Sequence, residues 1–148
     1  MTLGQYVRRR NGVALGAPGG LRAMLHRSLG AASFAGFWRY WNPIFGYGLA
    51  RWVHGPLLRI VARPLAVVLT FVVCGALHDL VTAAVRGSGA FLFTAWFLVV
   101  GLGVVAGEAV GMDLSKRPWW QRASANLLYL GGGLAIVLWV KGIVRGSA

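Results

Sequence analysis

Two short stretches carry the side chains of this 148-residue chain that could do chemistry. Asn42 ends the aromatic-basic stretch "FWRYWN", residues 37–42, and His78 and Asp79 lie in "CGALHDL", residues 74–80, inside a long apolar run. An ionisable side chain at the centre of a bilayer costs about 2.5–3.5 kcal/mol on insertion scales. Two adjacent ones therefore indicate a functional site or a specific hydrogen bond. The aromatic-basic stretch indicates a membrane-surface anchor, or half of an active site that is completed further along the chain.

His78 and Asp79 have separate tasks, because adjacent residues of a helix project about 100° apart. His78 either faces a cavity or is a neutral imidazole that hydrogen-bonds to a neighbouring helix. Asp79 is expected to find its own hydrogen-bond partner, on another helix or among lipid headgroups. Asn42 precedes Pro43, a pair typical of a helix N-cap followed by the first helical residue. Asn42 is therefore a cap alone, or a cap that also belongs to a site.

Three apolar runs predict an all-α integral membrane protein. They cover residues 65–85, 90–110 and about 123–140, and a membrane-spanning helix needs about 20 residues. The composition agrees, because 57% of the residues are hydrophobic and only 12% are charged, whereas a soluble domain carries about a quarter of charged residues. Gly103 and Gly107 form a Gly-x-x-x-Gly pair, which weakly favours close helix packing on the second run. We therefore expect a three-helix transmembrane region over residues 64–148.

The segment before these runs, residues 33–63, is aromatic and basic. Phe and Trp recur in it every three or four residues, which is typical of an amphipathic helix. Pro43 must interrupt that helix, so two short helices are predicted to lie at the interface or to re-enter the membrane. A re-entrant element requires protein or a wet cavity to cover its backbone. Residues 1–32 are basic and glycine-rich, and they are interpreted as a cytoplasmic arm with one short helix over 21–29 and loop elsewhere.

Fifteen Lys and Arg face only three acidic residues, Asp79, Glu108 and Asp113. Because the basic residues flank apolar runs, we expect a bilayer with anionic lipids as the partner, and no nucleic acid. Twelve of them precede the first run or lie between the second and third runs. The positive-inside rule then predicts a plasma (inner) membrane protein with its N-terminus cytoplasmic and its C-terminus outside. His26 and His54 lie in basic segments, where they are expected to be solvated.

Several familiar kinds of site find no support in the sequence. It contains no Gly-x-Ser-x-Gly, Cys-x-x-Cys, His-Glu-x-x-His or P-loop motif. Three acids offer little carboxylate for a metal ion, and the single cysteine, Cys74, forms no internal disulfide. A bis-histidine haem site built from His54 and His78 has no motif behind it. We therefore expect neither a metal nor a bound cofactor.

Taken together, "SFAGFWRYWNPIFGYGLARWVHGPL", residues 33–57, and the later "CGALHDL" resemble the membrane-bound O-acyltransferase (MBOAT) family. That family has an aromatic-basic "FW-R-x-W-N" type element ahead of an apolar helix that carries a histidine in a "G-x-x-H-[DEG]" type context. The resemblance covers about residues 33–85, and Asn42 and His78 stand 36 residues apart within it.

The resemblance implies that His78 is the catalytic histidine and Asn42 its polar companion. It also implies that Trp38, Arg39 and Trp41 bind substrate or donor beside the reaction chamber. A neutral histidine can take the proton of an acceptor hydroxyl as the hydroxyl attacks an acyl thioester, and an amide can orient the acceptor or stabilise developing charge. The implied function is acyl transfer from acyl-CoA or another acyl thioester to a lipid or glycan hydroxyl, without a metal.

The short chain leaves two interpretations of this resemblance. Full-length members of the family are several times larger, and many spanning helices precede their motif, so the chain resembles the C-terminal part of such a protein. Other membrane-protein subunits would then complete the chamber around this chain. Alternatively, the chain is a non-catalytic accessory subunit of a larger membrane complex of the respiratory or photosynthetic type.

Overall fold

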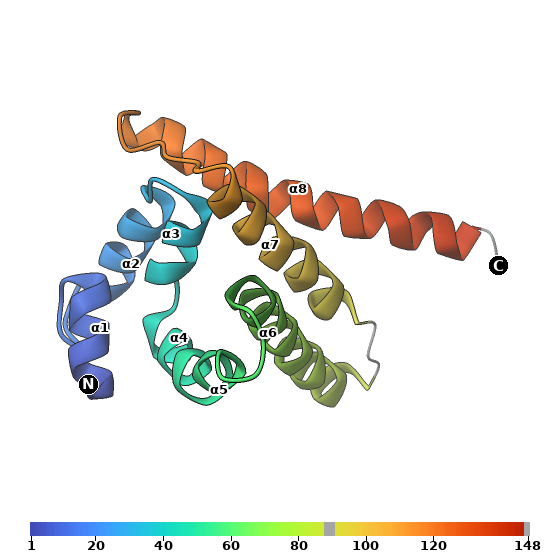
Figure 1. Cartoon of the computed structure of the whole chain (residues 1–148), viewed down its shortest axis with the longest axis horizontal. Coiled ribbons are helices and arrows are strands. Elements are labelled where there is room, and N and C mark those ends of the chain that lie inside the picture. The colour runs from blue at the N-terminus through green and yellow to red at the C-terminus, as the bar shows by residue number, and fades with distance from the viewer. Residues whose placement is uncertain (88–90, 147–148) are drawn as a thin grey trace.

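The computed structural model describes residues 1–87 and 91–146, and this part of the chain consists of helices joined by loops (Figure 1). The short elements are α1 (Leu3–Asn11), α2 (Gly20–Leu29), α3 (Phe34–Tyr40), α4 (Pro43–Leu49), the π-helical turn η1 (Ala50–His54) and α5 (Gly55–Leu57). The long helices are α6 (Arg63–Arg86), α7 (Leu92–Ala109) and α8 (Trp119–Gly146).

The three long helices are apolar and long enough to cross a membrane, which confirms the predicted all-α membrane fold. α6 and α7 coincide closely with the first two predicted runs. Residue 90, the predicted start of the second run, lies outside the described residues, as do residues 147–148 of the predicted transmembrane region. α8 begins earlier than predicted, directly after Pro118. A proline is tolerated at a helix start, because the backbone N–H that it lacks would have no partner within the helix there.

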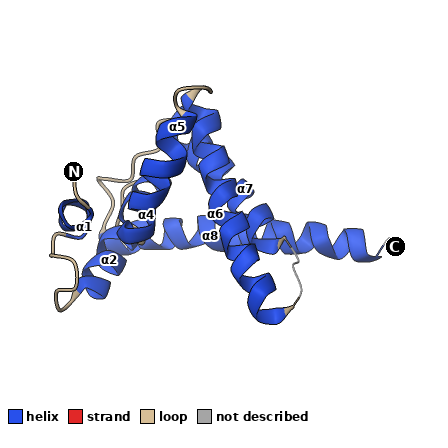
Figure 2. Cartoon of the chain, turned by 90° about the horizontal axis from the view of Figure 1, so that it is seen from below, coloured by secondary structure: helices blue, strands red, loops and turns tan. Residues whose placement is uncertain are grey.

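α6 and α7 form an antiparallel hairpin whose helices lie side by side (Figures 1 and 2). Two glycines permit the close approach. A Cβ at Gly75 would come within 2.6 Å of the Phe93 carbonyl oxygen, and one at Gly101 within 3.0 Å of the Phe71 side chain. Gly107 has open space around it, so the predicted Gly-x-x-x-Gly pair does not set this contact. The close packing comes instead from one glycine on each helix.

Asp79 caps the first turn of α7 from the neighbouring helix. Its carboxylate accepts hydrogen bonds from the backbone N–H groups of Phe93 and Thr94, at 3.0 and 2.7 Å, and from the Thr94 hydroxyl at 2.6 Å. The first N–H groups of a helix lack partners within the helix, and the positive end of the helix dipole favours an anion there. The predicted separate partner of Asp79 is therefore confirmed as an interhelical one.

The aromatic segment packs against protein. α3 ends at Tyr40, and Asn42 is the N-cap of α4 with a left-handed φ of 38°. The Asn42 side-chain oxygen accepts from the Phe45 N–H, so the predicted break between the two helices is confirmed. Phe34 and Phe37 are almost fully buried against α7, in the main hydrophobic core. Protein thus covers α3, as a re-entrant element requires.

The N-terminal arm is more ordered than the sequence suggests. The predicted short helix is present as α2, but the interpretation of the remaining arm as loop is wrong, because residues 3–11 form α1. A capping box starts α1: the Thr2 hydroxyl accepts from the Gln5 N–H, and the Gln5 side chain accepts from the Thr2 N–H. Tyr6 of α1 packs edge-on against Tyr47 of α4. The arm is therefore docked on the aromatic segment.

α8 holds the N-terminal half through its first turns. The buried side-chain amide of Asn126 donates to the carbonyls of Leu29 and Ala31, at 2.9 and 3.1 Å, and the Trp119 indole donates to the His26 carbonyl at 3.0 Å. The bond to Leu29 satisfies a carbonyl in the last turn of α2, where a helix leaves carbonyls without partners. The C-terminal half of α8 extends beyond the other helices (Figures 1 and 2).

Candidate functional site

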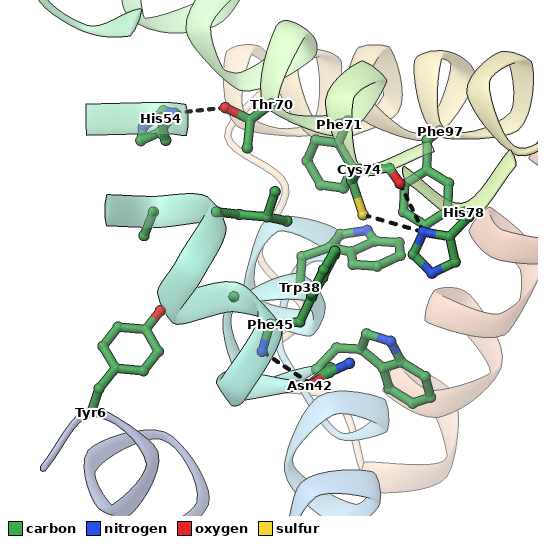
Figure 3. Close-up of a pocket in the computed structure, with 14 residues that line it drawn as sticks. Tyr6, Trp38, Asn42, Phe45, His54, Thr70, Phe71, Cys74, His78 and Phe97 are labelled. Atoms are coloured by element: carbon green, nitrogen blue, oxygen red, sulfur yellow. Dashed lines mark hydrogen bonds between the residues drawn. The ribbon is translucent and has the colours of Figure 1, made fainter. Parts of the chain in front are cut away.

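A cavity of about 210 Å³ lies between the short helices and α6 (Figure 3). Its wall is mostly apolar and aromatic, with contributions from α1, α3, α4, η1, α6 and α7. On α6 the lining residues Thr70, Cys74 and His78 follow one another at intervals of four, so they lie on one face of the helix. The opposite wall includes Asn42 and His54. The side chains of Asn42 and His78 are both exposed in this chain, so the cavity is open at their end.

The His78 ring is held in one tautomer. Its Nδ1 lies 2.7 Å from the carbonyl oxygen of Cys74, one helical turn earlier (Figure 3). Because a carbonyl oxygen only accepts, Nδ1 carries the proton, and in the neutral ring Nε2 is left with a lone pair. Phe97 stacks on the ring at 5.2 Å and Phe45 meets it edge-on at 5.8 Å. His78 is thus an oriented hydrogen-bond acceptor in an aromatic surrounding.

Asn42 combines its cap with a place in the cavity wall. Its Oδ1 accepts from the Phe45 N–H at 3.3 Å, and its backbone N–H points at the Met24 sulfur at 3.3 Å. No hydrogen bond from Nδ2 is present among the described residues, so the amide N–H groups remain to donate. Asn42 is therefore both a cap and a lining residue.

Trp38 brings an unused donor to the same wall. Its Nε1 is buried and has no hydrogen-bond partner among the described residues, whereas nearly all buried polar atoms in folded proteins have one. The ring is fixed by edge-on contacts with Phe37 and Phe71, at 5.2 and 5.1 Å. Trp41 lines the cavity as well and stacks on Phe37. Trp38 therefore lines the cavity with its ring and carries an indole N–H without a partner.

Arg39 lies apart from the other predicted site residues. It is exposed on α3 and lines a separate groove with Glu108 and Met112 at the end of α7. Adjacent residues on a helix point in different directions, so Trp38 and Arg39 cannot both face the cavity. Of the five predicted residues, four line one cavity and Arg39 does not.

His54 is the lining residue that the sequence interpretation missed. It is half-buried, and its Nδ1 lies 3.3 Å from the Thr70 hydroxyl, so the expectation of a solvated side chain is wrong. It ends the π-helical turn η1, a geometry that is rare and often found at functional sites. One sequence feature could have indicated the cavity that His54 lines. Thr70, Cys74 and His78 are spaced four residues apart, on one face of an otherwise apolar span.

The cavity does not bring its two histidines together around one ion. Thr70, which contacts His54, precedes His78 by eight residues, or about 12 Å along α6. Two ligands of one metal ion must each lie within about 2 Å of it. Within the described residues, no group of three or more His, Cys, Asp or Glu side chains could hold a metal ion.

Comparison with known proteins adds no relative. The chain matches no protein-family model, no curated protein and no solved structure. The residues that line the cavity are therefore the basis for assigning a function.

Proposed function

We propose that this cavity transfers an acyl group from a thioester donor, such as acyl-CoA, to a hydroxyl of a lipid or glycan. One observation carries the proposal: Asn42 and His78, which are 36 residues apart in the sequence, line the same cavity. The MBOAT-like sequence elements that contain them give the same assignment independently of the structure.

The reaction uses the lone pair on His78 Nε2. The acceptor hydroxyl forms a new C–O bond to the thioester carbonyl carbon while its proton passes to Nε2, which acts as general base. The C–S bond then breaks, and the departing sulfur takes the proton from His78. The products are an ester and a free thiol, and His78 returns to its starting state.

Two donors stabilise the charge that develops on the carbonyl oxygen. Trp38, whose buried Nε1–H has no partner, and Asn42, whose amide N–H groups are unused, both line the cavity. Fixed donors in a water-poor site act more strongly than in water and need no reorganisation during the reaction. The arginines of α1, α2, α3 and η1 supply positive charge for the phosphates of an acyl-CoA donor.

The proposed site works in a plasma (inner) membrane with anionic lipids. Eight of the fifteen basic residues precede α6, and Arg63 begins it. Three more lie between the start of the α7–α8 loop and the first turn of α8, and this distribution favours a cytoplasmic N-terminus and an outer C-terminus. Their positive charge attracts the anionic headgroups of the cytoplasmic leaflet.

We propose that other membrane-protein subunits close the open end of the cavity. Both reactive side chains, those of Asn42 and His78, are exposed in the isolated chain, whereas acyl transfer to an alcohol must keep water away from the thioester. Extraction in a mild detergent is expected to give particles heavier than this chain alone. A fully active preparation with the mass of one chain would contradict this part of the proposal.

The decisive test replaces the proposed base. Wild-type membranes incubated with radiolabelled acyl-CoA and a long-chain alcohol are expected to form labelled ester. His78→Ala is expected to lower the rate by at least about 100-fold, within the range for removal of a general base.

His26→Ala is the matched control, because His26 is exposed and lies outside the cavity. This variant should retain wild-type ester formation when present at the same level in the membrane. Equal rates of ester formation in the wild type and in His78→Ala would contradict the proposed function.

A further inference from the structure

A histidine lines the cavity at each of its two ends. His78 marks the end at Asn42, and His54 marks the other, beside Thr70 (Figure 3). The resemblance and the proposed chemistry use only the first of these histidines. The second has no role in the proposed transfer step, although it is half-buried and held by a hydrogen bond.

The Thr70 hydroxyl decides which nitrogen of His54 carries the proton. Its Oγ1 donates to the Ala66 carbonyl at 2.7 Å, and a hydroxyl has only one hydrogen. In the 3.3 Å contact with His54, Thr70 must therefore accept, and Nδ1–H of the ring donates. The neutral ring then has its lone pair on Nε2, as in His78. No hydrogen bond to either Nε2 is present among the described residues.

Between the two histidines the wall is apolar. Thr70, which contacts His54, and His78 are about 12 Å apart along the axis of α6. Phe45 and Leu49 of α4 and Phe71 of α6 line the cavity along this distance. A matching ligand has an O–H donor at each end, because both Nε2 atoms accept, and an apolar segment between them.

We propose that this cavity binds a diol: a molecule whose two hydroxyl groups are joined by an apolar chain about two helical turns long. One hydroxyl binds His78 Nε2 and the other binds His54 Nε2. That the diol is also the acyl acceptor rests on the proposed function, whereas its binding does not. His54 is then the residue that selects the acceptor, and it takes no part in the transfer step itself.

The test compares 1,8-octanediol with 1-octanol as probes. Binding to the purified full chain in detergent is followed by tryptophan fluorescence, because Trp38 and Trp41 line the cavity. The wild type is expected to bind the diol more tightly than the monoalcohol by about three- to ten-fold, the size of one additional hydrogen bond. His54→Phe is expected to remove this preference and to leave the affinity for 1-octanol within about two-fold of the wild type.

Two further variants keep the result interpretable. His54→Gln retains an acceptor oxygen and should keep part of the preference for the diol, which guards against a folding defect in His54→Phe. His26→Phe, outside the cavity, should behave as the wild type. Equal affinity of the wild type for both probes, or a preference that survives in His54→Phe, would overturn the inference.

Ester formation is measured separately on the same proteins. A His54-dependent preference for the diol without any ester would support the binding site and contradict the proposed acyl transfer. Ester formation without a preference between the probes would support the transfer and contradict the role of His54.

Discussion

At the scale of single residues, the cavity divides its polar atoms into acceptors and donors. With Nδ1 of His54 and His78 donating, the Nε2 atoms of the neutral rings are left as acceptors. The indole N–H of Trp38 and the amide N–H groups of Asn42 are unused donors. The donors suit a carbonyl oxygen and the acceptors suit hydroxyl groups. An ester-forming reaction needs both kinds of partner in one place, because it joins a carbonyl carbon to a hydroxyl oxygen.

Trp38→Phe separates the role of the indole N–H from that of the ring. Ester formation is expected to fall by about 10- to 100-fold, because loss of one fixed donor to a developing oxyanion has effects of this order or larger. Thermal unfolding in detergent should change little, since the variant loses some packing but also removes a buried donor that lacks a partner.

Trp139→Phe serves as the control for Trp38→Phe, because Trp139 is exposed on α8 and lies outside the cavity. Unchanged ester formation in Trp38→Phe would show that the indole N–H has no part in catalysis. A large drop in unfolding temperature would assign Trp38 a packing role instead.

At the scale of elements, α6 uses one of its faces to line the cavity and another to pack against α7. Thr70, Cys74 and His78 face the cavity, whereas Gly75 and Asp79 face α7. The two faces follow from residues four apart, which project in the same direction on a helix. The position of the site and the packing of the hairpin are thus set by the same few turns.

Gly75→Ala tests the close contact within the hairpin. The added Cβ would come within 2.7 Å of the Thr94 Cα, and backbone cannot move aside cheaply. We expect a loss of about 1–3 kcal/mol in the free energy of unfolding, as for other overpacked positions. The measurement is denaturant- or heat-induced loss of helical circular dichroism in detergent.

Gly107→Ala is the paired control for the hairpin. Its Cβ would meet nothing within 4 Å, so the change should be neutral, or stabilising by about 0.5–1 kcal/mol through helix propensity. A greater loss in Gly107→Ala than in Gly75→Ala would restore the Gly-x-x-x-Gly pair as the packing motif.

The helices were predictable wherever local sequence dominates. The three long helices follow from apolar runs, and the break at Asn42 follows from the restrictions that Pro43 imposes. α1 was missed because it is polar and arginine-rich, although the capping box from Thr2 to Gln5 was visible in the sequence. The place of His54 depends on a π-helical turn and on contact with Thr70, which local sequence does not encode.

At the scale of the whole molecule, the short N-terminal helices form one wall of the cavity and the long helices form the other. α1 contributes Tyr6 to the cavity, so the basic N-terminal segment is part of the site and not a free arm. Asn126 and Trp119 connect α8 to the end of α2, so the last described helix is bonded to the N-terminal helices.

The proposed orientation is tested with single cysteines in a Cys74→Ala background. Ser115→Cys lies in the loop between α7 and α8, and Val85→Cys lies at the far end of α6. In intact cells, a membrane-impermeant maleimide should label Val85→Cys and should reach Ser115→Cys only after the cells are opened. Labelling in the reverse order would contradict a cytoplasmic N-terminus.

The carboxylate of Asp79 also decides how α6 is rotated about its own axis. Its three hydrogen bonds to α7 allow one rotational setting of that turn, and His78 is the adjacent residue. A slip of the hairpin by one residue would turn the imidazole by about 100° and carry it off the cavity wall. Asp79 therefore positions the site from outside it: it does not line the cavity, yet it fixes the direction in which the neighbouring imidazole points.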